Sequence, residues 1–303
     1  MWFFGGMNRV TIRPRENRGT VECGRHAIAI KEATNTRRHL PVESQRSSTD
    51  CPRTQKGEIL TTKRLMVVVN PHGGTRRGTA VWDTVKPIFD AAEANLDVRV
   101  TQYPGHAREL VENSRPGEYD GVCAVGGDGT IHEVVDGLMQ PERAVRPPLG
   151  VLPAGTGNSV LQHFDCTDPQ IAAHRIVAGK TQPLDVIRVA TDHRVTHSVN
   201  IIGWGAVVDI NHTAERLRAL GPPRYALAAL SHILRARRRR ATLQLDGRMF
   251  DDDFLLAVAC NTKFTAKAMQ LAPHADTSDG KMDVVVVRRA SRMQLMKLFK
   301  MAY

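Results

Sequence analysis

Apolar and polar positions along residues 63–183 predict strands and helices in turn. The run RLMVVVN is apolar and β-branched up to Asn70, which is typical of a buried strand, and a glycine-containing PHGG follows it. The next segments read in order as a helix with Pro87 as a kink, a strand, a helix and a strand: AVWDTVKPIFDAAEANL (80–96), DVRVTQY (97–103), HARELVENS (106–114) and YDGVCAVGG (119–127). This alternation predicts an α/β domain with a parallel, doubly wound sheet, whose ligands bind at the carboxyl ends of the strands.

The pattern changes after residue 183 to short alternating or apolar runs separated by turns. These runs are LDVIRVA (184–190), THSVNII (196–202), ATLQLDGRMF (241–250), FLLAVACN (254–261) and MDVVVVRRA (282–290). One helical stretch interrupts them, AERLRALGPPRYALAALSHILRARRRR at 214–240. We therefore expect a second, β-rich and sandwich-like domain over residues 184–303.

Residues 1–62 show no sustained period and are rich in Ser, Thr, Arg and Pro, so we expect a basic, disordered tail. Residues 1–64 hold 13 Lys and Arg against 6 Asp and Glu, whereas residues 65–303 hold 29 against 25. Most of the net charge of +11 therefore belongs to the tail, and a nucleic-acid partner is not indicated. The five cysteines have no paired spacing and the twelve histidines no metal-ligand spacing, so neither a disulfide framework nor a metal site is predicted.

The apolar runs are too short for a membrane span, which needs about 20 residues. The opening MWFFGGM is also too short for the core of a signal peptide and lacks a basic lead-in. We expect a cytoplasmic protein without a transmembrane segment. The basic run RARRRR (235–240) fits either contact with anionic membrane lipid or a solubilising helix end.

Three glycine-rich turns each follow a predicted strand: NPHGG (70–74), GGDGT (126–130) and PAGTGN (153–158). Backbone N–H groups without neighbouring Cβ atoms are how loops cradle phosphate, and three such turns at one edge of a sheet favour a phosphate ligand. Other nucleotide motifs fail. HRIVAGKT has His174 where a P-loop needs its first glycine, and GDGTIH and GTGNSV lack the third glycine of a dinucleotide fingerprint.

The motifs NPHGG, TQYPGHARELV, GGDGTIHEVVDGLM, PLGVLPAGTGN and GWGAVVDINHTAERLRALGPPRY, in this order, resemble the catalytic domain shared by diacylglycerol, ceramide and sphingosine kinases. The resemblance runs from about residue 64 to the end, and HARELV and HEVVDGLM are more similar to the sphingosine and ceramide kinase branch. It implies an ATP- and Mg²⁺-dependent kinase that phosphorylates a hydroxyl of a diacylglycerol, ceramide or sphingoid lipid. The lipid would be met at a membrane surface, to which the protein would bind peripherally, and the second domain, residues 184–303, would bind its acyl chains.

The resemblance also implies roles for single residues. Asp128 matches the general base that takes the proton from the lipid hydroxyl, and a helix-capping role is its structural alternative. Asp185, Asp209 and Asn211 match positions near the substrate. The positions expected to bind ATP are Asn70, Pro71, Gly73, Gly74, Thr101, Gly126, Gly127, Gly129, Thr130, Glu133, Gly155, Thr156, Gly157, Arg218 and Arg224.

Two departures from the family pattern matter. Family members continue with a strand that carries Asp-Gly-Glu, which this chain lacks, so we expect the second domain to be incomplete at its C-terminus. Asn211 stands where sphingosine kinases have an aspartate for the polar head of the substrate, which favours a neutral lipid over sphingosine.

Two other functions stay open at this point. NAD kinases share a GGDGT-type loop, but they lack the segment with a tryptophan-glycine pair, a glutamate and two arginines seen at 203–224. A catalytically silent protein that binds lipid or nucleotide is the second alternative, supported by the missing Asp-Gly-Glu segment. The sequence gives no oligomeric state.

Overall fold

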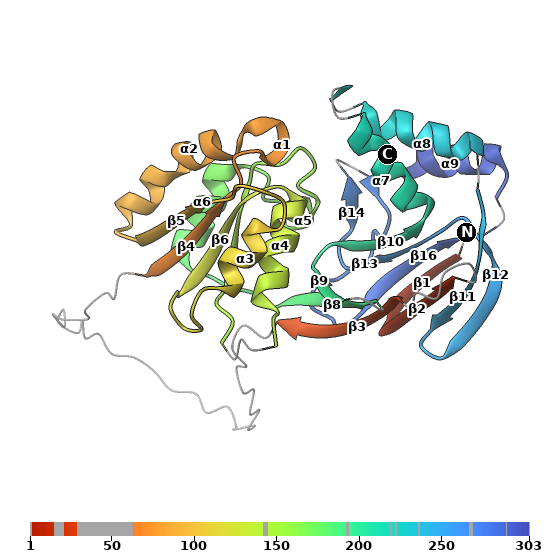
Figure 1. Cartoon of the computed structure of the whole chain (residues 1–303), viewed down its shortest axis with the longest axis horizontal. Helices are drawn as coiled ribbons and strands as arrows, with labels where there is room; N and C mark the ends of the chain where they lie inside the picture. The colour runs from red at the N-terminus through yellow and green to blue at the C-terminus, as the bar shows by residue number, and fades with distance from the viewer. Residues whose placement is uncertain are drawn as a thin grey trace, which may run out of the picture.

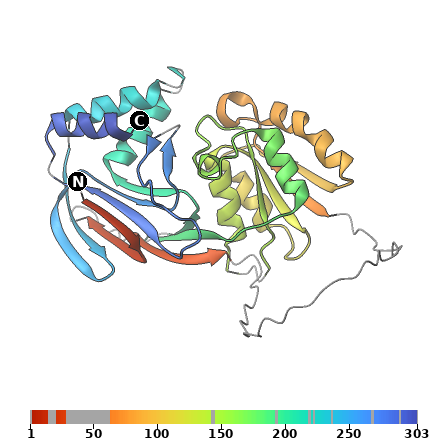
Figure 2. The same ribbon diagram turned by 180° about the vertical axis from the view of Figure 1, so that it is seen from behind.

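The computed structural model describes residues 2–14, 21–28, 63–141, 145–191, 194–217, 220–221, 223–235, 237–266, 269–288 and 290–302. Two domains lie side by side (Figure 1). After residue 178 the chain leaves the first domain, and at residue 184 it enters a strand of the second. Seen from behind, the same two domains flank the junction (Figure 2).

The first domain is built on a four-stranded parallel sheet, as the sequence predicts. Across the sheet the strands are β5 (Asn95–Val100), β4 (Arg64–Val69), β6 (Gly121–Gly126) and β7 (Leu149–Pro153). The helices are α1 (Gly73–Arg76), α2 (Gly78–Ala91), α3 (His106–Glu112), α4 (Asp128–Leu138), α5 (Ser159–His163) and α6 (Pro169–Ala178).

Both faces of this sheet are covered because successive side chains of a strand point to opposite faces. Val67 and Val69 of β4 pack in one core with residues of α2 and α6, such as Phe89 and Ala173. Met66 and Val68 belong to a core on the other side, with residues of α3 and α4. The continuous apolar run therefore reflects a strand buried on both faces, which confirms the doubly wound arrangement.

The second domain is a β-sandwich. One sheet has the order β1 (Trp2–Met7), β16 (Met282–Val287), β13 (Leu256–Cys260), β10 (Ile201–Gly205). The other has the order β12 (Arg248–Phe254), β11 (Arg239–Leu245), β2 (Arg9–Pro14), β3 (Val21–Ile28), β8 (Leu184–Ala190), β9 (Val195–Ser198). All described pairings within these two sheets are antiparallel, and β14 (Phe264–Ala266) pairs with β15 (Met269–Gln270).

The core of the sandwich lies between the two sheets, where Ile187, Leu243 and Leu245 meet Val284 and Val286. The long helical stretch expected at 214–240 is divided into α7 (Ala206–Arg216) and α8 (Arg224–Arg235), and Arg239 and Arg240 already belong to β11. A last helix, α9 (Arg292–Ala302), contacts α8 on the outside of the domain (Figure 1). Among the described residues, no helix has both the length and the apolar character needed to cross a bilayer.

The expectation of a disordered tail over residues 1–62 is wrong for residues 2–14 and 21–28. These residues form β1, β2 and β3, which are strands of the second domain (Figure 1). Val10 and Ile12 of β2 are buried in the core of the sandwich, and β2 pairs with β3 on one side and with β11, from the other end of the chain, on the other side. The pattern in RVTIRP is too short to stand out, and its partner β11 lies more than 200 residues away, so little local signal announces the strand. The remainder of residues 1–62 lies outside the described residues.

Candidate active site

The three glycine-rich turns meet at the carboxyl ends of β4, β6 and β7. Their backbones touch. A Cβ atom on Gly155 would lie 2.5 Å from the Cα of Gly127, and one on Gly74 would lie 2.6 Å from the carbonyl oxygen of Ala154. Glycine is required here because the loops approach more closely than any side chain permits.

Polar side chains connect the same loops. Asn70 donates from Nδ2 to Thr130 Oγ1 (2.9 Å), and its Oδ1 accepts from the N–H of His72 (3.0 Å). Asn158, in a left-handed conformation with φ of 49°, accepts from the N–H of Gly155 (3.0 Å). The first and second loops are thereby tied to one another, and the third is folded on itself.

The helix α4 begins where the three loops meet. The helix starts at Asp128 directly after Gly127, so the first N–H groups of the helix have no acceptor within it and carry the positive end of its dipole. A Cβ on Gly129 would meet nothing within 4 Å, which leaves the approach to these groups open. Such a helix N-terminus beside bare glycine loops suits a phosphate group.

The carboxylate of Asp128 points from this N-terminus toward α5. Its Oδ2 accepts from the N–H of Ser159 (3.1 Å) and its Oδ1 from the N–H of Val160 (3.3 Å). Asp128 therefore caps α5, in contrast to the alternative that it caps its own helix. Gly157 lies close by, since a Cβ there would be 3.2 Å from Asp128 Oδ2. These contacts hold the carboxylate in one position next to the phosphate loops.

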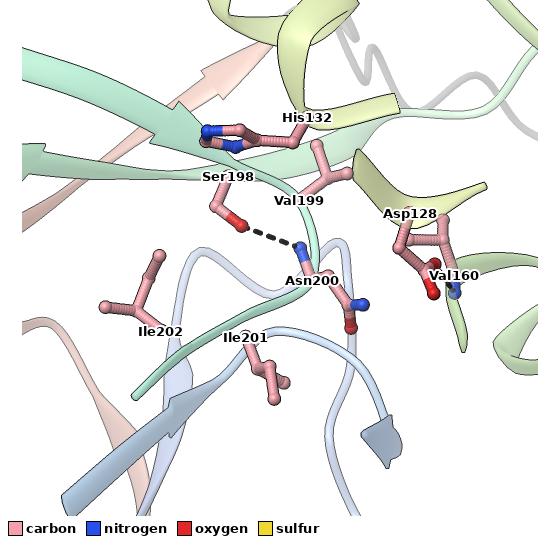
Figure 3. Close-up of a pocket in the computed structure, with 8 residues that line it drawn as sticks. All are labelled: Asp128, His132, Val160, Ser198, Val199, Asn200, Ile201 and Ile202. Atoms are coloured by element: carbon pink, nitrogen blue, oxygen red, sulfur yellow. Dashed lines mark hydrogen bonds between the residues drawn. The ribbon is translucent and has the colours of Figure 1, made fainter. Parts of the chain in front are cut away.

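A cavity of about 230 Å³ lies between the two domains beside Asp128 (Figure 3). The first domain supplies Asp128, His132 and Val160, and the second supplies residues 198–202, where the chain passes from β9 to β10. Because the carboxylate lies between the phosphate loops and this cavity, a molecule in the cavity could present a hydroxyl to Asp128 and then to a phosphate. His132, Ser198 and Asn200 were given no role from the sequence.

Apolar packing across the junction fixes this cavity. Ile131, Val135 and Val160 of the first domain form one buried cluster with Val186 and Val199 of the second. The cavity is therefore bounded by a packed core, which limits how far the two walls can separate.

A buried carboxylate also joins the domains. Asp136 Oδ1 accepts from the backbone N–H of His197 (2.9 Å) and lies 3.0 Å from its Nδ1, and Arg108 is 3.3 Å from Oδ2. Burial acts to raise the pKa of Asp136, but the hydrogen bonds from His197 and the charge of Arg108 outweigh it, so the pKa lies below its ordinary value. No sequence signal pointed to this pair, because positions 136 and 197 belong to different domains.

Two other predicted ATP positions have structural partners of their own. Glu133 accepts from the N–H groups of Gly105 (2.9 Å) and Ala107 (3.2 Å), and so holds the start of α3. Thr101 is buried directly after β5 and donates its N–H to the carbonyl of Val69 (2.9 Å). Both residues border the loops at the carboxyl edge of the sheet.

The arginines expected at the ATP phosphates belong to the second domain. Arg224 is the first residue of α8 and pairs with Glu215 at 3.6 Å. Arg218 lies outside the described residues.

The residues expected near the substrate do not line the cavity. Both carboxylate oxygens of Asp209 accept from Nη2 of Arg239 (2.9 and 2.8 Å), and Asn211 is exposed on α7. Asp185 is buried and its Oδ2 accepts from the N–H of Gly280 (2.8 Å). The described residues also contain no cluster of three or more His, Cys, Asp or Glu side chains that could hold a metal ion.

Known proteins share this combination of a glycine-loop α/β domain with a β-sandwich. The crystal structure of a diacylglycerol kinase from Bacillus anthracis str. Sterne superimposes with a TM-score of 0.62 at 23% identity, covering 79% of this chain and 78% of that chain. The fold is therefore that of a diacylglycerol kinase-like protein.

Family models cover both domains. The model described as the diacylglycerol kinase catalytic domain matches residues 64–189, and the one described as the YegS C-terminal NAD kinase beta sandwich-like domain matches residues 200–303. Residues 64–189 therefore match the diacylglycerol kinase catalytic domain family, and the second domain matches the sandwich domain described with YegS.

Two relatives illustrate the range of this family. Sphingosine kinase 1 of Arabidopsis thaliana is 28% identical over 286 residues, which cover 78% of this chain and 59% of the plant protein. The diacylglycerol kinase of Bacillus subtilis is 27% identical over 244 residues, covering 79% and 78%. The chain thus spans less than two thirds of the length of the plant relative.

Proposed function

We propose that the chain transfers the γ-phosphate of ATP to a hydroxyl group of a lipid of the diacylglycerol, ceramide or sphingoid type. The observation that carries this proposal is the position of Asp128 between the phosphate loops and the cavity at the domain junction. A carboxylate there can accept the proton of a hydroxyl as it attacks phosphorus, and general bases of this kind contribute about 100- to 10,000-fold to a rate. The named activities of the relatives agree with this class of reaction.

The residues at the loops fit a nucleoside triphosphate. The α4 N-terminus and the bare backbones around Gly127 and Gly155 would bind its phosphates, since they offer N–H donors and no obstructing side chains. Mg²⁺ is usually held by one or two carboxylates together with the phosphates themselves, and Asp128 is the acidic residue at these loops that could contribute. The ion would neutralise charge on the transferring phosphate. The remaining contributions of this chain are the positioning of the nucleotide and of the acceptor hydroxyl.

A membrane surface is the second part of the proposal, because the substrate resides there. Pro223, Ala226, Leu227, Leu230, Ile233 and Met296 line an apolar groove between α8 and α9. Leu227, Leu230 and Met296 are 47%, 40% and 41% exposed, so the groove faces solvent.

The charges around this groove suit an anionic bilayer. Neither α8 nor α9 contains an acidic residue, whereas Arg235, Arg292 and Lys297 are exposed on them. Arg237 and Arg238, directly after α8, are exposed as well. The apolar side chains of the groove could contact the acyl chains at the surface of an anionic bilayer, and the basic residues around it could contact the lipid phosphate groups.

The test of the reaction is transfer of labelled γ-phosphate by the full chain. Mixed micelles containing diacylglycerol, ceramide and sphingosine would be compared with NAD as acceptor, in the presence of Mg²⁺ and ATP. Label in the lipid fraction supports the proposal. Label in NADP would instead favour an NAD kinase-like enzyme, the alternative suggested by the name of the second family model. Binding of nucleotide or lipid without transfer of phosphate would indicate a catalytically silent binding protein.

A further inference from the structure

Asn200 stands at the cavity in the second domain, between β9 and β10, opposite the wall that Asp128 and Val160 form. Figure 3 shows its side-chain amide pointing into the space between the two walls. The sequence pattern predicts one strand over residues 196–202, but the strand breaks at residues 199–200. This break is what brings Asn200 to the cavity.

Two buried residues at the end of β13 hold this segment rigidly. Asn261 is fully buried and donates its N–H to the carbonyl of Asn200 (2.8 Å) and its Nδ2 to the carbonyl of Val199 (3.0 Å). Thr262, 1% exposed, donates its hydroxyl to Asn200 Oδ1 (2.5 Å). A side chain fixed by hydrogen bonds behind it is preorganised for a ligand in front of it.

The contact with Thr262 decides which end of the amide faces the cavity. A second acceptor, the carbonyl of Phe264, lies 3.2 Å from the same hydroxyl, but a hydroxyl has one proton and the shorter contact takes it. Oδ1 is thus turned toward Thr262, and within the described part of the chain no hydrogen bond from Nδ2 is formed. Asn200 therefore presents N–H donors to the cavity.

Among the other residues that line the cavity, no side chain forms a hydrogen bond with the Nδ2 group of Asn200. Asp128 is the one acidic residue among the lining residues, and they include no Lys or Arg. Ser198 accepts from the backbone N–H of Asn200 (3.3 Å), and His132 is hydrogen-bonded to the backbone of His197. The remaining lining residues, Val160, Val199, Ile201 and Ile202, are apolar.

We propose that Asn200 is a specificity-determining residue that binds the acyl carbonyl of the substrate and selects acylated lipid alcohols over free sphingoid bases. This proposal rests on the proposed lipid kinase function. In diacylglycerol and ceramide an ester or amide carbonyl lies a few bonds from the hydroxyl, and a carbonyl oxygen only accepts hydrogen bonds, which matches the Nδ2 donors. A free sphingoid base has an ammonium group there, which is itself a donor and finds no acceptor on Asn200.

The experiment uses the full chain and its Asn200→Asp variant, with kcat/KM measured for diacylglycerol, ceramide and sphingosine in the same micelles. The substitution is isosteric and keeps the oxygen that accepts from Thr262, but it replaces the donor by a carboxylate oxygen. We expect kcat/KM for the two acylated lipids to fall about 10- to 100-fold relative to sphingosine, with the KM for ATP within about twofold of the parent. A ratio between lipids that stays within about twofold, or an equal loss for all three lipids, would overturn the proposal.

Three further variants sharpen this result. Thr262→Val frees the amide to rotate, so it should shift the ratio in the same direction but by less. Asn95→Asp makes the same chemical change at an exposed position at the amino end of β5, far from the loops, and should change nothing. Asn211→Asp tests the role that the family resemblance gives to position 211. If that role is right, Asn211→Asp, and not Asn200→Asp, would move the preference toward sphingosine.

Calorimetric titration with dioctanoylglycerol and octanoyl-ceramide separates this proposal from the proposed reaction. If the parent transfers no phosphate but binds these lipids, and Asn200→Asp weakens binding about tenfold or more, the reaction is wrong and the role of Asn200 stands. If the parent transfers phosphate and Asn200→Asp alters neither binding nor the ratio between lipids, the role of Asn200 is wrong. Failure of the parent to bind either lipid contradicts both.

Discussion

Asp128 combines a structural and a chemical task at one carboxylate. It accepts hydrogen bonds from the first two N–H groups of α5 and lies between the phosphate loops and the cavity. The capping contacts limit its rotation, so the same hydrogen bonds that stabilise α5 orient the oxygen that would receive a proton.

Replacing Asp128 by Asn should therefore reduce phosphoryl transfer about 100- to 10,000-fold, the usual loss when a general base is removed. The amide keeps one acceptor for α5 but turns an NH₂ group toward the other N–H, so a modest fall in melting temperature should accompany it. Asp83→Asn, on the exposed face of α2, is the control and should affect neither. A variant at position 128 that kept more than a tenth of the parent rate would exclude Asp128 as the base.

Single residues were predictable where their neighbours in the chain define them. The glycines, Asn70 and Asp128 stand in short motifs directly after apolar runs, and the ends of parallel strands must converge. The Asp136–His197 pair and Asn200 could not be predicted, because their roles depend on contacts between domains and on the strand break at residues 199–200.

Secondary-structure elements show the same contrast between local and distant information. The strands β4, β6, β8 and β16 coincide with long apolar runs, whereas β2 has few apolar side chains and pairs with β11 from the far end of the sequence as well as with its neighbour β3. The turn after β11 contributes as well. Asp246 accepts from the backbone N–H groups of Asn8 (3.1 Å) and Arg9 (2.6 Å), which anchors the point where the chain passes from β1 in one sheet to β2 in the other.

Because Ile12 is 6% exposed in the core of the sandwich, Ile12→Ala should lower the free energy of unfolding by about 2 to 5 kcal/mol. Urea denaturation measures this change. Ile171→Ala on α6 is the matched control, since Ile171 is 52% exposed and its truncation should change stability by less than about 0.5 kcal/mol. Equal effects of the two substitutions would mean that β2 contributes no more to the core than a surface residue.

At the scale of the whole molecule, two histidines make the domain junction sensitive to acid. Burial is the main cause that lowers the pKa of His132 below its usual 6.5, with Arg194 acting in the same direction and Asp136 and Glu133 opposing it. Burial and then the charge of Lys263 lower the pKa of His163, which Asp276 and Asp165 oppose, and His163 Nδ1 accepts from the N–H of Lys263 (3.3 Å).

A lowered histidine pKa means that the unfolded chain binds protons more readily than the folded one. The associated stability is complete above about pH 6.5 and is lost as the pH falls through the lower folded pKa values. The lowered pKa of Asp136 acts outside this range, since its contribution is lost only below about pH 4. Unfolding free energies should therefore be smaller at pH 5 than at pH 7.5.

Urea titrations at the two pH values measure this effect in the parent and in His132→Gln and His163→Gln, each of which should reduce the difference. His174→Gln, at an exposed position on α6, serves as the control. A difference that neither junction variant reduces would assign the pH dependence to other groups.

The groove between α8 and α9 predicts how the molecule meets lipid. Leu230→Glu combined with Met296→Glu should reduce sedimentation with vesicles of phosphatidylserine and phosphatidylcholine about tenfold or more, because it places charge where apolar contact is expected. Binding of the parent should also weaken as salt rises. Val100→Glu, a 53% exposed position on the edge strand β5, is the control. Vesicle binding that survives the double substitution would place the membrane contact elsewhere.

The pairing of β1 with β16 has a consequence for the order of events during synthesis. Trp2 lies opposite Val286, so β1 pairs with a strand that is made more than 250 residues later. The residues between them take roughly 15 to 60 s to make at ~5–20 residues per second. Residues 63–183 are complete well before then and contain every described strand of their own sheet, whereas β1 must wait for β16, and β2, which can pair early with β3, must wait for β11 at its other edge. For that interval the nascent chain carries two strands with unpaired edges, so chaperone binding early in translation would bear directly on the yield of the folded protein.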